Sequence, residues 1–202
     1  STLGGTHITP EDIAIIRCLP NFIILAPCDP LELKECVKFL SKRKKYPAYL
    51  RIGKSGEKNF TKESDQKWVF GKPRRILKGK KICLISSGPI ISKFYEILEP
   101  LKEKKIFPSI YSFHTIKPVN KQSIKKILSQ YKIVLTLEDS SEVNGLGSIF
   151  REHAFLNKYR GKLINFSLKD KHIKNYGSQN DLLASHGISA KNIYKQIIKN
   201  YK

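Results

Sequence analysis

Two places in the sequence carry residue types that could bind and polarise an anionic or carbonyl substrate. The first is Gly4-Gly5-Thr6-His7, which lies just ahead of Thr9-Pro10-Glu11-Asp12, a pattern typical of a helix start. Flexible glycines, a hydroxyl, an imidazole and the free N–H groups of a helix start suit such a substrate, with His7 as the candidate catalytic residue. A loop histidine without a catalytic role explains the same residues, so both interpretations stay open.

The second place is Arg51, at the end of the strand expected over Ala48–Ile52. Ligands of α/β proteins bind at the carboxyl ends of parallel strands. An arginine there could hold a phosphate through two parallel N–H bonds, which makes Arg51 a candidate substrate-binding residue. A surface ion pair is the alternative interpretation.

Other chemically capable residues give weaker indications. Glu138 and Asp139 follow an expected strand, and we interpret them as hydrogen-bonded loop anchors rather than functional groups. Gly145-Leu146-Gly147 resembles part of a dinucleotide-binding fingerprint, but Phe150 stands where its third glycine belongs, so close packing of a helix start is the better interpretation. Nucleophile-elbow, Walker A and zincin motifs are absent, and we interpret the remaining histidines as structural: His114, His153, His172 and His186.

The composition predicts a soluble globular protein. A length of 202 residues suits one large or two small domains, and 40% hydrophobic residues are enough for a packed core. The apolar runs are too short to span a bilayer, and no signal peptide is visible, so we expect a cytoplasmic protein without membrane contact. The cysteines lack metal-ligand spacing and lie in or beside apolar stretches, which predicts buried free thiols without a metal: Cys18, Cys28, Cys36 and Cys83.

The formal net charge of +21 suits anionic ligands such as small phosphorylated substrates. Lysine supplies 31 of the 38 cationic residues, whereas specific readers of nucleic acid favour arginine, so we regard nucleic acid as an unlikely partner. Gly53–Lys80 shows no clean hydrophobic period. We interpret it as a connection whose Phe60, Trp68 and Phe70 pack onto neighbouring surfaces, with nucleic-acid stacking on these rings as the alternative.

Hydrophobic runs alternate with helical patterns along the chain, which predicts an α/β fold with a mainly parallel twisted sheet and helices on both faces. We expect a first domain over residues 1–53, a linker over 54–73 and a second domain over 74–202. The first domain has two expected strands, too few to close its own sheet.

Several segments resemble the transketolase family, in matching order and spacing. The first part of the chain resembles the second half of the pyrimidine-binding domain, in residues 6–14 (THITPEDIA), 17–21 (RCLPN), 26–30 (APCDP) and 50–53 (LRIG). The second part resembles the transketolase C-terminal domain, in residues 87–88 (SG), 116–118 (IKP), 136–139 (TLED) and 145–148 (GLGS).

The resemblance implies a thiamine-diphosphate enzyme that transfers a two-carbon ketol unit between sugar phosphates. In the family, the histidine matching His7 contacts the substrate near its reacting carbonyl, and the arginine matching Arg51 binds the substrate phosphate. Leu3 stands where many members have an aspartate, and Ile8 where many have a second histidine, so donor and acceptor preferences can differ. The Leu-Gly-x-Thr-His variant resembles the split, two-subunit transketolases.

The resemblance does not extend to the family's diphosphate- and metal-binding domain or to the glutamate that activates the cofactor. We therefore expect thiamine diphosphate and Mg²⁺ to act in the complete enzyme, with none bound to these residues alone, which should be inactive. The implied partners are an N-terminal cofactor-binding domain or subunit and further copies in a homo-oligomer. A non-catalytic binding or regulatory module derived from the C-terminal domain is the alternative function.

Overall fold

The computed structural model describes residues 9–43, 45–53, 56–64, 66–173 and 176–201. Its larger sheet has the strand order β3-β5-β4-β7-β8, in which every neighbouring pair is parallel except β3 with β5. The strands are β3 (Arg74–Leu77), β4 (Ile82–Ser86), β5 (Ser109–Ser112), β7 (Ile133–Ser141) and β8 (Lys162–Leu168). All five residues of the central strand β4 are buried, as expected of a strand covered on both faces.

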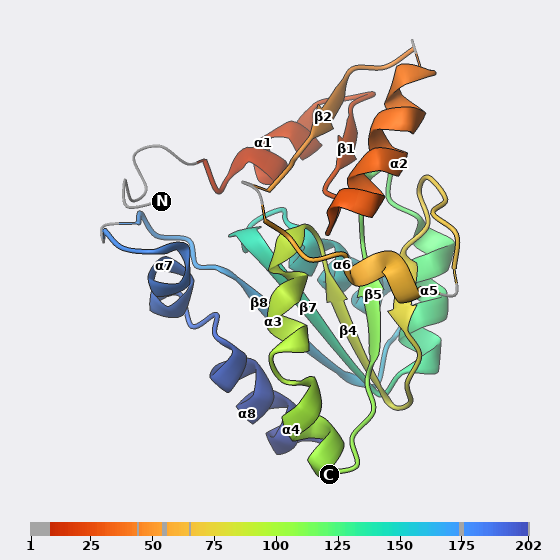
Figure 1. Ribbon diagram of the computed structural model, residues 1–202. Helices are drawn as coiled ribbons and strands as arrows, with labels where there is room; N and C mark the ends of the chain where they lie inside the picture. Colours follow the sequence, from red (N-terminus) through yellow and green to blue (C-terminus); the bar gives the residue numbers. More distant parts are fainter. Residues whose placement is uncertain (1–8, 44, 54–55, 65, 174–175, 202) are drawn as a thin grey trace.

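Helices cover both faces of this sheet, which confirms the predicted fold class (Figure 1). Ile82 and Leu84 of β4 pack on one side, and Cys83 and Ile85 pack on the other, because successive strand residues point to opposite faces. The first side is covered by η3 (Pro89–Ile91), α3 (Ser92–Tyr95), α4 (Leu98–Glu103), α7 (Gln179–Ser185) and α8 (Ala190–Asn200). The second side is covered by α5 (Lys121–Gln130) and α6 (Leu146–Leu156).

A smaller sheet with the order β2-β1-β6 lies at one end of the molecule, at the top of Figure 1. Its strands are β1 (Ile23–Leu25), β2 (Ala48–Leu50) and β6 (Thr115–Lys117), and its helices are α1 (Asp12–Cys18) and α2 (Pro30–Ser41). β1 and β2 are parallel, whereas β6 joins β1 antiparallel from a position after β5. The chain therefore returns to the smaller sheet after starting the larger one. The division into 1–53, 54–73 and 74–202 stays a prediction.

Three local expectations differ from the structure. The first helix begins at Asp12 and not at a Thr9 cap, because Asp12 N–H donates to the Thr9 carbonyl (3.2 Å) in a preceding turn. The helix expected after Gly88 is broken into η3, α3 and α4, and Pro100 is accommodated in the first turn of α4. β3 and β6 were not expected, since three or four residues are too few to show a period.

The aromatic residues of the connection pack against the protein's own rings, as expected. Phe70 stacks on Phe39 of α2, with ring centroids 4.1 Å apart. Trp68 stacks on His114 at 5.0 Å. Phe60 of η2 (Phe60–Glu63) contacts Tyr95 at 4.6 Å. These contacts favour the connection over a platform for nucleic-acid bases.

The cysteine expectation is correct for three residues and wrong for one. Cys28, Cys36 and Cys83 are buried free thiols, and burial raises the pKa of each. Cys18 is exposed, because it lies in the last turn of α1, of which only Ile13 is fully buried. In the described ranges no helix is long and apolar enough to cross a membrane.

Asp29 joins α2 to the Gly53–Lys80 connection through hydrogen bonds, and its loss should destabilise the fold. One carboxylate oxygen accepts the N-cap bond from Glu32 N–H (2.8 Å), and the other accepts from the amide (2.6 Å) and hydroxyl (2.8 Å) of Thr61. Asn120, the cap of α5, accepts a single N–H bond from Ser123. We expect Asp29→Ala to lower the free energy of unfolding by about 3 kcal/mol and Asn120→Ala by about 1 kcal/mol, measured by urea denaturation. Equal losses would contradict this role.

Candidate functional site

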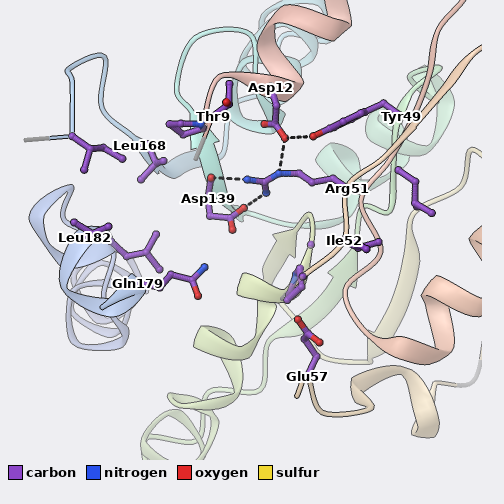
Figure 2. Close-up of a pocket in the computed structure, with 17 residues that line it drawn as sticks. Thr9, Asp12, Tyr49, Arg51, Ile52, Glu57, Asp139, Leu168, Gln179 and Leu182 are labelled. Carbon is purple, nitrogen blue, oxygen red and sulfur yellow. Dashed lines mark hydrogen bonds and ion pairs between the residues drawn. The ribbon is translucent and has the colours of Figure 1, made fainter. Parts of the chain in front are cut away.

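A cavity of about 640 Å³ lies where the smaller sheet meets the larger one. The described residues that line it come from the start of α1, the end of β2, the segment after Gly53, the Gly88-Pro89 turn, β7, the end of β8 and α7. Figure 2 shows Arg51 and Asp139 on one side of this space, with Glu57 and Gln179 on others. The cavity therefore lies at strand ends, where α/β proteins bind ligands.

Arg51 reaches this cavity from the end of β2 and joins the two sheets. Its amide N–H donates to the Leu25 carbonyl (2.8 Å), which continues the β1–β2 pairing. Its Nε donates to Asp12 Oδ2 (2.9 Å) at the start of α1. Its Nη1 donates to the Asp139 carboxylate, and its Nη2 donates to the Asp139 carbonyl oxygen (3.2 Å). The three guanidinium nitrogens thus donate to Asp12 of α1 and to Asp139 of β7 (Figure 2).

Electrostatics keep this arginine firmly charged. Burial lowers the pKa of Arg51, but the Asp139 and Asp12 carboxylates outweigh that effect and raise the pKa above its ordinary range. Asp12 also accepts a hydrogen bond from the Tyr49 hydroxyl (2.7 Å). Burial and this bond raise the pKa of Tyr49 to about 12, so the phenol stays protonated and donates to Asp12.

Glu138 is a hydrogen-bonded anchor, as interpreted from the sequence, but it holds the start of a helix and not a loop. Its neighbour Asp139, interpreted in the same way, lines the cavity. The buried Glu138 carboxylate accepts from the Leu146 (2.7 Å) and Gly147 (2.8 Å) amides at the start of α6 and from the Ser140 hydroxyl (2.6 Å). A Cβ at position 145 would overlap this carboxylate, which explains the glycine there. The Gly-Leu-Gly segment is therefore a close-packed helix start.

The structure describes one of the two candidate site residues. Arg51 lines the cavity, whereas His7 lies outside the described residues. Asp12, Glu57 and Asp139 line the same cavity and were missed as site residues. The acidic first turn of a helix and an acid after a strand are each common, so only their proximity to Arg51 marks them. The other histidines that we interpreted as structural do not line the cavity.

The described residues do not fit thiamine diphosphate with its metal. They contain no group of three or more His, Cys, Asp or Glu side chains able to hold a metal ion. The described lining of the cavity carries three carboxylates and a single guanidinium, which disfavours a diphosphate.

Comparison with known proteins assigns the chain to a family. The family model described as "Transketolase, C-terminal domain" matches residues 71–193, more than half of the chain. The chain belongs to this family. The resemblance found in the sequence is therefore confirmed.

Individual relatives extend the likeness over nearly the whole chain. It is 28% identical to a subunit of the apulose-4-phosphate transketolase of Phocaeicola vulgatus, over 99% of this chain and 63% of that protein. It is 30% identical to 1-deoxy-D-xylulose-5-phosphate synthase of Caldanaerobacter subterraneus, over 98% of this chain and 32% of that protein.

A solved structure titled "Split gene transketolase, inactive beta4 tetramer" has the same fold, with a TM-score of 0.85 at 23% identity. It is matched over 98% of this chain and 63% of its own. This transketolase C-terminal-domain chain thus spans less than two thirds of each of these proteins.

The anchor at Glu138 should make stability depend on pH. Burial raises the pKa of Glu138 from 4.5 to about 7, although the bonds from Ser140, Gly147 and Leu146 lower it. The folded protein then binds more protons than the unfolded chain between pH 4.5 and 7. The contribution of Glu138 to stability is complete below pH 4.5 and is lost as the pH rises through 7.

We expect Glu138 to lower the free energy of unfolding of the wild type by about 3 kcal/mol as the pH rises from 4.5 to 7. This part of the pH dependence should be absent in Glu138→Gln. Urea unfolding at pH 5 and pH 8 measures the difference, with Glu99→Gln as an exposed control. Parallel pH profiles for the wild type and Glu138→Gln would contradict the assignment.

Proposed function

We propose that this chain is the C-terminal part of a thiamine-diphosphate-dependent transketolase-like enzyme that transfers a two-carbon ketol unit between sugar phosphates. The observation that carries the proposal is the position of Arg51. It lies at a strand end and lines a cavity of about 640 Å³. The resemblance of residues 50–53 to the family matches it to the arginine that binds the substrate phosphate there. A guanidinium is well suited to that role because its planar fork matches the oxygens of a phosphate.

In this proposal, Arg51 binds the substrate phosphate and His7 contacts the substrate near its reacting carbonyl. The residues matching the C-terminal domain serve assembly more than chemistry. Thiamine diphosphate and Mg²⁺ are bound by an N-terminal cofactor-binding domain or subunit, and the complete cytoplasmic enzyme contains further copies of this chain.

Two relatives support an arrangement with a separate partner chain. The protein from Phocaeicola vulgatus is named as one subunit of its transketolase, and the solved structure is titled as a split-gene transketolase. By analogy, the cofactor site is supplied by another polypeptide. The partner to test is an N-terminal transketolase subunit that carries the cofactor site.

Reconstitution tests the proposal directly. The chain is co-expressed with that N-terminal subunit and assayed for ketol transfer between sugar phosphates with thiamine diphosphate and Mg²⁺. Activity that requires both polypeptides supports the enzyme. Formation of a stable complex without turnover, across a panel of ketose and aldose phosphates, would instead favour the non-catalytic module.

Arg51→Gln should separate phosphate binding from assembly. We expect the KM for a phosphorylated substrate to rise about tenfold to hundredfold, because a charge-assisted bidentate contact is lost. Turnover of an unphosphorylated ketol donor such as hydroxypyruvate with an unphosphorylated aldehyde should change much less.

Arg160→Gln, an exposed arginine outside the cavity, is the matched control. An equal rise in KM for phosphorylated and unphosphorylated substrates would contradict a phosphate role for Arg51.

A further inference from the structure

Oxygens of the protein's own chain already accept hydrogen bonds from all three guanidinium nitrogens of Arg51. An arginine side chain has five N–H donors, and a phosphate is held best along an edge that offers two of them in parallel. Asp139 takes the edge formed by Nη1 and Nη2, through its carboxylate and its carbonyl oxygen. Asp12 takes Nε. A phosphate therefore finds no edge of the guanidinium on which both nitrogens are without a hydrogen-bond acceptor.

The charge around the cavity also opposes a phosphate. Its described lining carries Asp12, Glu57 and Asp139 against the single cation of Arg51, although the chain as a whole has a net charge of +21. Like charges a few ångströms apart in a partly buried site repel strongly, because little water screens them. The carboxylate next to Arg51 must give way before a dianion binds.

The two aspartates differ in how firmly they are held. Asp12 has other partners: its Oδ2 accepts from the Tyr49 hydroxyl (2.7 Å), and its Oδ1 accepts from the Ile13 amide (2.8 Å). Among the described residues, Arg51 is the only hydrogen-bond donor to the Asp139 carboxylate. Displacing Asp139 therefore breaks one side-chain contact, whereas displacing Asp12 breaks a network.

We propose that Asp139 is a specificity-determining residue, whose carboxylate competes with the substrate phosphate for Arg51 and so sets the affinity of the site for phosphorylated substrates. The inference rests on the proposed role of Arg51 in binding phosphate. Asp12 stays on Nε and orients the guanidinium, while the Asp139 carboxylate and the phosphate exchange at Nη1. Asp139 comes from β7, so the larger sheet sets the affinity of an arginine carried by the smaller one.

The test uses the full 202-residue chain and inorganic phosphate as the probe. Phosphate affinity is measured from the shift in unfolding temperature, against sodium chloride of the same ionic strength. Asp139→Asn keeps the shape of the side chain and removes its charge. Glu142→Gln is the matched control, since it removes the same charge three residues along the chain without lining the cavity.

We expect Asp139→Asn to bind phosphate about tenfold more tightly than the wild type, and Glu142→Gln to change the affinity by less than a factor of about two. Adding Arg51→Gln to Asp139→Asn should abolish the gain. Asp139→Ser, which shortens the side chain, should show the same gain and serves if the asparagine variant does not fold. Equal phosphate responses in the wild type, Asp139→Asn and Asp139→Ser would overturn the inference.

The outcomes separate this inference from the proposed function. If Arg51→Gln weakens phosphate binding while both Asp139 variants leave it unchanged, Arg51 keeps its phosphate role and the competition by Asp139 is refuted. If Asp139→Asn tightens binding equally with and without Arg51, phosphate binds elsewhere, and both the competition and the phosphate role of Arg51 fail.

Discussion

An arginine cannot lose its charge inside a protein, so a largely buried guanidinium must be surrounded by acceptors. Arg51 meets this requirement with Asp12 at the start of α1 and with Asp139 in β7. The positions of α1 and of the two sheets are coupled through this one side chain.

Further polar contacts join the same parts of the structure, so Arg51 is one of several groups that hold the junction. The buried carboxylate of Glu32 accepts from the Cys28 amide (2.9 Å) and the Ser112 hydroxyl (2.7 Å), which joins α2 to β5. Ala26 donates to the His114 carbonyl (2.8 Å), where the smaller sheet follows the end of β5. Because these contacts also join the two sheets, the junction does not depend on Arg51 alone. Arg51 can therefore take part in the junction and also bind a substrate.

The sequence predicted those features that depend on nearby residues. The alternation of hydrophobic runs and helical patterns predicted the α/β fold, and the Gly-Leu-Gly segment was correctly interpreted as a close-packed helix start. An ion pair of Arg51 was the alternative interpretation from the sequence and is present in the structure. Its partners were not predicted, because Asp12 and Asp139 lie 39 and 88 residues away. The strand β6 was missed for a related reason, since its place depends on pairing with β1 and not on its own sequence.

The central claim is that the guanidinium of Arg51 bonds both the aspartates of the junction and a substrate phosphate. A crystal structure of the reconstituted complex with a bound sugar phosphate tests this most directly. We expect the phosphate to contact Nη1 of Arg51, the Asp139 carboxylate to have moved off this atom, and Asp12 still to accept from Nε. A phosphate bound at another cation, with Arg51 still paired to both aspartates, would contradict it.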